Sequence, residues 1–174
     1  MKKIILTRQQ IQKKVEELGR RISEDFRDEE LLLVGVLNGA FIFLADLARE
    51  IALDLRIDFI RVASYGAGSS SAGTVTFTKD VELPVRGKKI LLVEDIIDTG
   101  RTIARLKQHF LGQGAVSVQV CALIDKKERR EVEVQADYTG FDVAEGFLVG
   151  YGLDFAEQHR CLPDIYHLEN PTAP

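Results

Sequence analysis

The amino-acid sequence predicts an α/β fold in which helices flank a mainly parallel β-sheet. Three observations support this prediction. Short apolar runs, bounded by polar residues or glycine, suit strands that are buried on both faces of a sheet. Segments with a helical spacing of apolar residues alternate with these runs along the chain. The four prolines, Pro84, Pro163, Pro171 and Pro174, leave the middle of the chain open to regular structure.

The first third of the chain predicts a helix, a strand and a second helix. Residues 7–10 (TRQQ) have the form of a capping box, and apolar residues then recur at helical spacing at Ile11, Val15, Leu18 and Ile22. The run LLLVGVL (31–37) is fully apolar and is followed by Asn38 and Gly39, which indicates a buried strand. The segment AFIFLADLAREI (40–51) predicts the second helix.

The rest of the chain predicts further strands and one more helix. Strands are expected over 57–65 (IDFIRVASY), 89–93 (KILLV) and 116–124 (VSVQVCALI), the last of which alternates and is rich in β-branched residues. A helix is expected over 102–111, and residues 147–149 (FLV) could form a short strand. Strands and helices therefore alternate, as a parallel sheet requires.

Length, composition and charge limit the possible classes of protein. The chain has 174 residues, 45% apolar and 29% charged, which predicts one domain over 1–174. Cys121 and Cys161 lie outside any CxxC motif, which excludes a disulfide scaffold and a zinc site built on thiolates. The net charge of -4 argues against broad nucleic-acid binding. Because no apolar stretch approaches the ~20 residues of a membrane helix and residues 4–6 are too few for a secretory signal, we expect no membrane association and a cytoplasmic location.

Polar and glycine-rich segments follow the predicted strands. They are Asn38-Gly39, Ser64-Tyr65 with the tract GAGSSSAG (66–73), EDIIDTGRT (94–102) and DKK (125–127). In open α/β sheets, ligands bind beyond the carboxyl ends of the strands. These segments are therefore the candidates for a binding site.

Three carboxylates, Glu94, Asp95 and Asp98, follow the predicted strand 89–93. Carboxylates at a strand end lose solvation and repel one another, so they need a cation or hydroxyl donors nearby. Accepting hydrogen bonds from ribose hydroxyls and holding a hard cation such as Mg²⁺ both fit this need. The alternative is structural: Asp98 or Thr99 caps the following helix while Glu94 and Asp95 face water.

The next four residues, Thr99, Gly100, Arg101 and Thr102, have the character of a phosphate-binding turn. Backbone N–H groups at a helix N-terminus, two hydroxyls, a guanidinium and a glycine suit a monophosphate. Together with the acidic residues they indicate a sugar phosphate. No GxxxxGK[ST] string occurs, and the single Asp-Thr-Gly (98–100) in an α/β chain does not suit an aspartic protease.

The segment VEDIIDTGRT (93–102) closely resembles the phosphoribosyl pyrophosphate (PRPP) signature of type I phosphoribosyltransferases, in the form found in the hypoxanthine (guanine) enzymes. Further matching segments occur in the same order: VLNGAFIFLADL (36–47), ASYG (63–66), LIDKK (123–127), DYTGF (137–141) and GFLVGYGLDFAEQHR (146–160). The resemblance implies a Rossmann-like sheet flanked by helices, with a core over about 31–150. It also implies a small hood formed by about 1–30 and 150–174.

The resemblance implies an activity: N9 of hypoxanthine, and also of guanine, displaces pyrophosphate from C1 of PRPP to give IMP or GMP. By analogy, Glu94 and Asp95 bind the ribose hydroxyls and Mg²⁺, and residues 99–102 hold the 5'-phosphate. Asp98 matches the general base, which acts at the purine N7. These roles agree with the chemistry of the residue types.

The resemblance also assigns the purine and pyrophosphate contacts. Lys126 matches the lysine that donates to the 6-oxo group and so rejects adenine, which has an amino group there. Phe147 matches the ring that stacks on the base, and Leu148 the neighbour whose backbone faces the purine edge. Asp154 matches a ligand of a second Mg²⁺, and Arg160 the arginine at the pyrophosphate. Without the resemblance, Lys126 reads as a solvated lysine and 147–149 as plain core.

Two loops complete the expected site. Ser64 and Tyr65, with the tract 66–73, match a lid that closes over the reacting centre; the alternative is a flexible surface hairpin. Asn38 and Gly39 match the pyrophosphate loop, which binds mainly through backbone N–H groups and often contains a non-proline cis peptide. Many relatives carry Lys or Arg where Asn38 stands, and often Lys where Arg101 stands.

Other functions compete with this interpretation. Some proteins of this fold bind RNA and regulate pyrimidine genes, but the net charge and the set Lys126, Phe147 and Asp154 count against that function. A xanthine-preferring transferase remains an alternative, because discrimination at the purine 2-position depends on backbone geometry. The partners expected are therefore PRPP and a 6-oxopurine, with no nucleic acid, and a homodimer or homotetramer.

Overall fold

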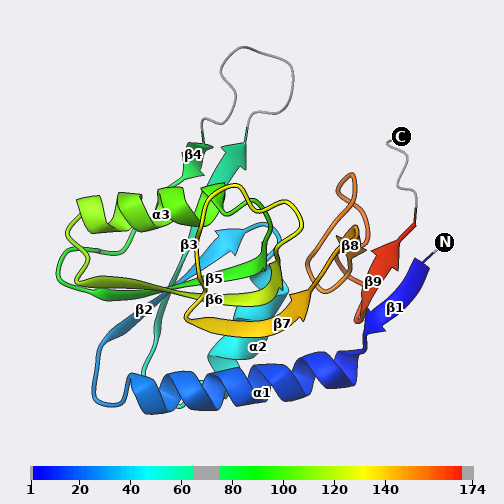
Figure 1. The fold of residues 1–174 in the computed structure, drawn as a ribbon. Helices are drawn as coiled ribbons and strands as arrows, with labels where there is room; N and C mark the ends of the chain where they lie inside the picture. The colour runs from blue at the N-terminus through cyan, green and yellow to red at the C-terminus, as the bar shows by residue number, and fades with distance from the viewer. Residues whose placement is uncertain (1, 65–74, 170–174) are drawn as a thin grey trace.

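A computed structural model describes residues 2–64 and 75–169. Its centre is a six-stranded sheet (Figure 1). Across the sheet, the strands lie in the order β4 (Val75–Lys79), β3 (Arg56–Ser64), β2 (Leu31–Leu37), β5 (Lys89–Ile97), β6 (Ser117–Lys126) and β7 (Tyr138–Val143). All neighbours are parallel except β3 and β4. The predicted α/β fold with a mainly parallel sheet is confirmed.

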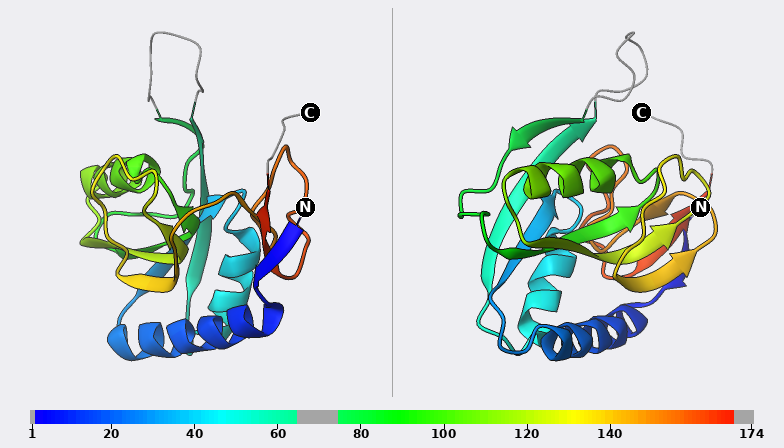
Figure 2. Two further views of the ribbon diagram at one scale, coloured as in Figure 1. Left: turned by 45° about the vertical axis from the view of Figure 1, so that its right-hand side comes forward. Right: turned by 60° about the vertical axis from the view of Figure 1, so that its left-hand side comes forward.

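Helices cover both faces of this sheet (Figures 1 and 2). Helices α1 (Arg8–Asp25) and α2 (Phe41–Glu50) pack on one face, and α3 (Arg101–Gly112) packs on the other. The capping box of α1 is present, since the Thr7 side chain accepts from the Gln10 N–H and the Gln10 side chain accepts from the Thr7 N–H. The fold is therefore a three-layer sandwich.

Strand β2 shows why this sequence lies in the centre of the sandwich. Leu31 and Leu33 pack with the layer of α1 and α2, whereas Leu32 and Val34 pack with the layer of α3. A strand that is buried on both faces needs this continuous apolar run. Each fully buried leucine side chain contributes roughly 1.5–3 kcal/mol relative to exposure.

The order of the strands creates a crevice between β2 and β5. From β2 the chain continues through α2 to β3 on one side, and from β5 it continues through α3 to β6 on the other. The two connections cover opposite faces, so they separate at the carboxyl ends of β2 and β5. Such a reversal of strand order is where α/β sheets bind ligands.

Two strands extend further than the sequence predicts. Strand β5 continues to Ile97, so Glu94 and Asp95 lie within it, and β6 continues to Lys126. The parallel register pairs Glu94 with Ala122 and Ile97 with Asp125. The hydrogen-bonded neighbour strand therefore extends β5 past residues with low intrinsic strand propensity.

A second, three-stranded sheet lies beside the main one (Figure 1). Strand β1 (Lys2–Leu6) pairs antiparallel with β9 (Ile165–Leu168), which also pairs with β8 (Leu148–Val149). Of the segment 1–30 expected in the hood, only β1 joins this sheet, because α1 packs its apolar stripe against α2 and the main sheet. Strands β1, β4, β7 and β9 are absent from the sequence-based prediction. No helix of the described residues is long and apolar enough to cross a membrane.

Candidate functional site

The carboxyl ends of β2 and β5 border a cleft of about 220 Å³. Its lining comes from β2, β3 and β5, from the loop after β2, and from the turn before α3 with the first residues of that helix: Val36, Leu37, Gly39, Val62, Glu94, Asp95, Ile96, Ile97, Asp98, Thr99, Gly100, Thr102 and Ile103. The carboxylates and the 99–102 turn, which sequence analysis assigned to one sugar phosphate, thus border one cavity.

The carboxylates Glu94 and Asp95 are both buried at this cleft. The Asp95 N–H donates to Glu94 Oε1 at 3.2 Å, and the Ile96 N–H donates to Asp95 Oδ1 at 2.8 Å. Burial, and then the charge of Asp95, raises the pKa of Glu94 well above its usual range. Burial likewise raises the pKa of Asp95. A nearby cation or hydroxyl donors would favour the ionised form of both acids.

The loop after β2 lies directly against Asp95. The peptide bond between Leu37 and Asn38 is cis, as the resemblance implies. A Cβ at Gly39 would lie 1.7 Å from Asp95 Oδ2, and a Cβ at Gly152 would lie 2.0 Å from the Gly39 carbonyl oxygen. Only glycine at both positions lets the three segments approach this closely.

Residues 131–132 hold the turn before α3 through main-chain hydrogen bonds. The Thr99 carbonyl accepts the N–H groups of Glu131 and Val132 at 2.9 and 3.0 Å. Gly100 has a φ of 84°, and a Cβ there would lie 2.4 Å from the Val132 carbonyl oxygen. The Arg101 guanidinium, expected at a phosphate, instead forms an ion pair with Glu131. The groups of the turn that this ion pair does not engage are its backbone N–H groups and the hydroxyls of Thr99 and Thr102.

Asp98 and Lys126 are brought together from neighbouring strands. Asp98 Oδ1 lies 3.7 Å from Lys126 Nζ and, among the described residues, is the one buried side-chain oxygen or nitrogen without a hydrogen-bond partner. Lys126 is buried, donates to the Gly146 carbonyl at 3.1 Å and lies 3.5 Å from Glu128 Oε2. An unpartnered carboxylate oxygen beside a buried ammonium offers an acceptor and a donor to one ligand.

Phe147 and Leu148 follow Gly146, whose carbonyl binds Lys126. The Phe147 ring is half exposed and meets Phe155 edge to face at 5.2 Å, whereas Leu148 is buried. Phe147 therefore offers an open ring near the Asp98 and Lys126 pair, and Leu148 serves as core.

Arg160 and Asp154 bind each other. Arg160 Nη2 lies 2.8 Å from Asp154 Oδ1, and Nη1 donates to the Gly152 carbonyl at 2.8 Å. Gly152 packs on Gly39, so this ion pair lies next to the loop after β2. Within the described part of the chain, no three His, Cys, Asp or Glu side chains group closely enough to hold a metal, so Glu94, Asp95 and Asp154 do not form one ligand cluster.

The expected lid falls largely outside the described residues. Tyr65 and the tract 66–73 are not described, and Ser64 is described only as the last backbone position of β3. That strand ends at the carboxyl edge of the sheet, as β2 and β5 do.

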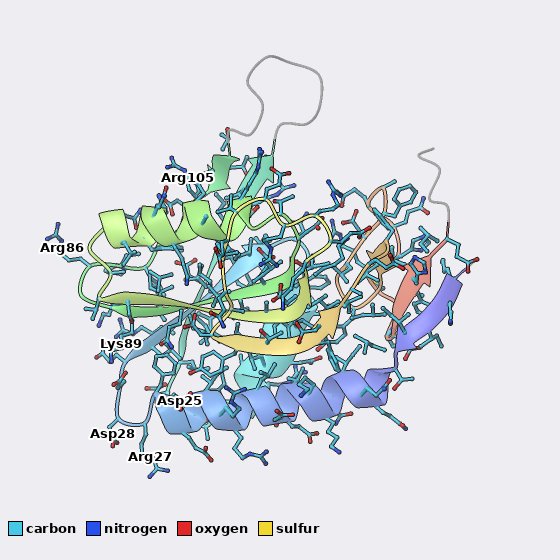
Figure 3. All side chains as sticks on the ribbon, in the orientation of Figure 1. Asp25, Arg27, Asp28, Arg86, Lys89 and Arg105 are labelled. Atoms are coloured by element: carbon cyan, nitrogen blue, oxygen red, sulfur yellow. The ribbon has the colours of Figure 1, made fainter. Side chains whose placement is uncertain are left out.

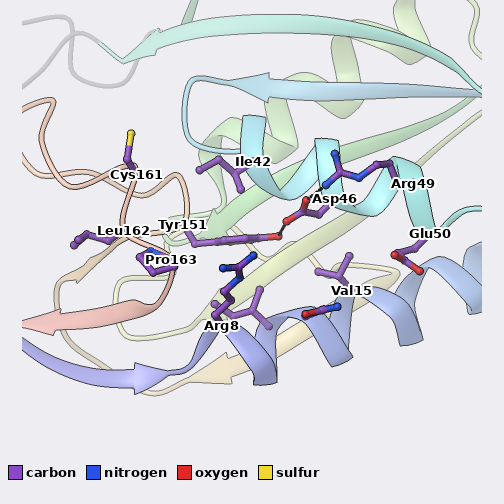
Figure 4. Close-up of a pocket in the computed structure, with 12 residues that line it drawn as sticks. Arg8, Val15, Ile42, Asp46, Arg49, Glu50, Tyr151, Cys161, Leu162 and Pro163 are labelled. Atoms are coloured by element: carbon purple, nitrogen blue, oxygen red, sulfur yellow. Dashed lines mark hydrogen bonds and ion pairs between the residues drawn. The ribbon is translucent and has the colours of Figure 1, made fainter.

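A second cavity, of about 370 Å³, lies between α1, α2 and residues 151–163 (Figure 4). Inside it, the Tyr151 hydroxyl donates to Asp46 Oδ2 at 2.6 Å. Burial, and then this hydrogen bond, raises the pKa of Tyr151. None of the residues that line this second cavity was predicted as a site residue. The hydrogen bond between Tyr151 and Asp46 links the segment 150–152 to α2.

The sequence did not single out Arg130 or Tyr151. Arg130 lies in the charged stretch 126–131, yet its side chain is only 16% exposed and contacts the ends of β5 and β6. The sequence shows only that Arg130 lies four residues after Lys126 in a charged stretch. This spacing does not distinguish an arginine that contacts the sheet from one that faces solvent.

Comparison with known proteins finds that this chain is similar to phosphoribosyltransferases. A family model described as phosphoribosyl transferase domain matches residues 1–156. A hypoxanthine-guanine phosphoribosyltransferase of Aquifex aeolicus is 43% identical over 97% of this chain and 95% of that protein. A hypoxanthine phosphoribosyltransferase of Escherichia coli is 40% identical over 93% and 92%. A solved hypoxanthine-guanine phosphoribosyltransferase of Bacillus anthracis, with HEPES in its active site, matches with a TM-score of 0.90 and 43% identity over 95% and 98%.

Proposed function

This chain belongs to the phosphoribosyltransferase family, and we propose that its carboxyl-edge cleft transfers the 5-phosphoribosyl group of PRPP to N9 of hypoxanthine. The products are IMP and pyrophosphate, and guanine is the second base, which gives GMP. The protein is thus a hypoxanthine phosphoribosyltransferase of purine salvage. A regulatory RNA-binding role is not favoured, because the similar proteins are named as these transferases.

One observation carries the choice of a 6-oxopurine: the buried, unpartnered Asp98 Oδ1 lies 3.7 Å from Lys126 Nζ. A 6-oxopurine presents N7 and O6 on one edge. Asp98 takes or shares the proton at N7 as general base, and Lys126 donates to O6. An amino group at C6 would meet the ammonium as donor against donor, so adenine is rejected. Phe147 stacks on the base, and the backbone of Leu148 faces its edge.

The acidic pair acts on the ribose. Departure of pyrophosphate leaves positive charge on the ribose ring, and preorganised negative charge stabilises such a transition state. In the proposal Glu94 and Asp95 accept the ribose 2'- and 3'-hydroxyls. The 5'-phosphate lies on the turn of Thr99, Gly100, Arg101 and Thr102, where the N–H groups at the start of α3 point at it.

The residues present fit Mg²⁺ as the cofactor. Two carboxyl groups whose burial raises their pKa are hard oxygen donors that a divalent cation would stabilise in the ionised form. Glu94 and Asp95 would hold one ion together with PRPP oxygens, and Asp154 a second. When bound, Mg²⁺ neutralises charge on the departing pyrophosphate.

The pyrophosphate itself lies against the loop of Asn38 and Gly39. Backbone N–H groups of that loop bind it, and Asn38 adds no positive charge where many relatives have a basic side chain. Arg160 supplies the charge. Because Arg160 forms an ion pair with Asp154, pyrophosphate binding requires the guanidinium to exchange a carboxylate partner for a phosphate.

Several wider features belong to the same proposal. Ser64 and Tyr65 act in a lid that excludes water from the reacting centre. The chain forms one domain over 1–174, with its core over about 31–150 and the chain ends forming the hood. It assembles as a homodimer or homotetramer. A cytoplasmic location suits its two free cysteines.

A spectrophotometric assay of the purified chain with PRPP, Mg²⁺ and each of hypoxanthine, guanine, xanthine and adenine tests the proposal. We expect turnover of hypoxanthine and guanine and none of adenine. Absence of turnover for every 6-oxopurine would overturn the proposal, and faster use of xanthine would establish the xanthine-preferring alternative.

Two variants test the assigned roles. Asp98→Asn should lower kcat with little change in PRPP binding, and Asp28→Asn is the matched control, because Asp28 is exposed at the far end of the sheet and its φ of 65° suits asparagine (Figure 3). Lys126→Ala should raise KM for the purine more than KM for PRPP. An active Asp98→Asn, or equal effects of Lys126→Ala on both substrates, would remove the corresponding role.

A further inference from the structure

The guanidinium of Arg130 lies against the carboxyl ends of β5 and β6. It donates to four main-chain carbonyls: Nε to Asp98 at 2.9 Å, Nη1 to Val134 at 2.8 Å, and Nη2 to Ile97 and Lys126, each at 3.3 Å. Nη2 also forms an ion pair with the buried carboxylate of Asp125. One side chain thus contacts the main chain of both residues that face the purine in the proposal.

These contacts lie where the ladder between β5 and β6 ends, although Lys126 still pairs with Val143 of β7. The register of β5 and β6 pairs Ile97 with Asp125, and the next residues are Asp98 and Lys126. Beyond that pair the ladder no longer fixes the spacing of the two strands. Main-chain carbonyls that leave a sheet in a partly buried place need another donor. Arg130 supplies it to both strands at once.

The spacing that Arg130 fixes is the one that purine recognition uses. Asp98 and Lys126 lie 3.7 Å apart, and one base must meet both. A displacement of about 1 Å in such a constellation costs roughly a hundredfold in rate. The contact to Val134 further ties this corner to the segment whose residues 131–132 support the phosphate turn.

Only a guanidinium makes this set of bonds. Its donors form a planar fork that reaches carbonyls on two strands and a carboxylate together, whereas an ammonium is a compact point charge. The neighbouring Arg129 is different, because its side chain is 66% exposed and reaches only the outer oxygen of Asp98, at 3.5 Å.

We propose that Arg130 is a positioning residue for purine recognition, which acts by holding the main chain of Asp98 and Lys126 at a fixed separation. The inference rests on the proposed function, because it takes Asp98 and Lys126 as the purine-binding pair. Arg130 contacts no substrate in this role.

The test compares Arg130→Lys with the matched control Arg27→Lys, whose arginine is exposed at the end of the molecule far from the small sheet (Figure 3). Arg130→Lys keeps the charge and loses the fork, so KM for hypoxanthine should rise about tenfold, the equivalent of one or two lost hydrogen bonds. KM for PRPP should change less than about threefold. Arg27→Lys should change neither.

A double-mutant cycle separates positioning from a general loss of stability. If Arg130 acts through Lys126, the effect of Arg130→Lys on KM for hypoxanthine should largely vanish in a Lys126→Ala background. Asp125→Asn, which removes the anionic partner of the guanidinium, should shift KM for hypoxanthine in the same direction by less, and it covers the case in which Arg130→Lys does not fold.

The outcomes are distinguishable. Unchanged KM for hypoxanthine in a folded Arg130→Lys, parallel rises in both KM values, or fully additive effects with Lys126→Ala would each overturn the positioning role while leaving the proposed function intact. If Arg130→Lys does not fold, unchanged kinetics of Asp125→Asn would overturn it. A wild-type protein that turns over no 6-oxopurine would overturn the proposed function, and this inference with it.

Discussion

Replacing Gly39 with alanine adds one methyl group at the point where the pyrophosphate loop meets the acidic pair. The added Cβ would lie 1.7 Å from Asp95 Oδ2 and 2.5 Å from its Cγ. Gly39 is not among the residues with positive φ, so the substitution introduces a collision without backbone strain. Because the colliding atoms belong to a side chain, the carboxyl group can turn away while the fold persists.

The size of the effect follows from these distances. Non-bonded carbon and oxygen atoms normally stay at least about 3.4 Å apart, so Asp95 Oδ2 or the loop has to move by well over 1 Å. A misplacement of that size in a catalytic group costs on the order of a hundredfold, and we expect kcat/KM for PRPP to fall by about that factor. This corresponds to about 2.7 kcal/mol of transition-state stabilisation.

The assay follows IMP formation at saturating hypoxanthine while PRPP and Mg²⁺ are varied. Gly112→Ala is the control, because a Cβ on Gly112 meets nothing within 4 Å and the position lies in α3, where alanine is favourable by roughly 0.5–1 kcal/mol. Thermal unfolding of both variants separates lost activity from lost fold. If Gly39→Ala keeps wild-type kcat/KM, the contact between Gly39 and Asp95 has no catalytic weight and the reasoning is refuted.

Three further predictions concern ionisation, accessibility and packing. Burial, and then the charge of its neighbouring carboxylate, raises the pKa of Glu94, so its contribution to stability is present at low pH and is lost as pH rises through the folded-state pKa. The melting temperature of Glu94→Gln in EDTA should therefore exceed that of wild type by a margin that grows as pH rises above the usual pKa of a glutamate, and a constant difference would contradict the raised pKa. Ellman's reagent should label one thiol per native chain, because Cys161 is exposed whereas Cys121 is buried with a raised pKa; two fast thiols would disprove this. Tyr151→Phe removes the donor to Asp46 and should lower the free energy of unfolding by about 1–2 kcal/mol in urea titrations, and an unchanged midpoint would show that water replaces the bond.

Local pattern was enough to predict the sandwich and the position of its binding edge. The run 31–37 was predicted as a strand buried on both faces and is one, and the capping box at Thr7 located the start of α1 within one residue. The predicted carboxyl ends of β5 and β6 were too early, because pairing between these two strands extends both of them. Glu94 and Asp95 have low strand propensity, but pairing with β6 extends β5 past them.

Nonlocal contacts account for what the sequence did not predict. Strand β1 exists because it pairs with β9 at the other end of the chain, and Lys2–Leu6 alone is too short to signal it. The same holds within the charged stretch after β6. Lys126 was predicted from resemblance, whereas Arg130, equally charged, is only 16% exposed because four carbonyls and Asp125 meet there. Arg101 pairs with Glu131, a partner that only the folded loop brings within reach.

The reversal of strand order between β2 and β5 has a kinetic consequence. The two walls of the cleft belong to stretches that are distant along the chain, since Leu31 pairs with Lys89. Closing so long a loop is entropically costly, and contacts of this kind slow folding. An intermediate in which either half has collapsed separately lacks the cleft altogether. Recovery of PRPP binding during refolding should therefore coincide with the pairing of β2 with β5. A bound nucleotide should stabilise only the chains in which this pairing is complete.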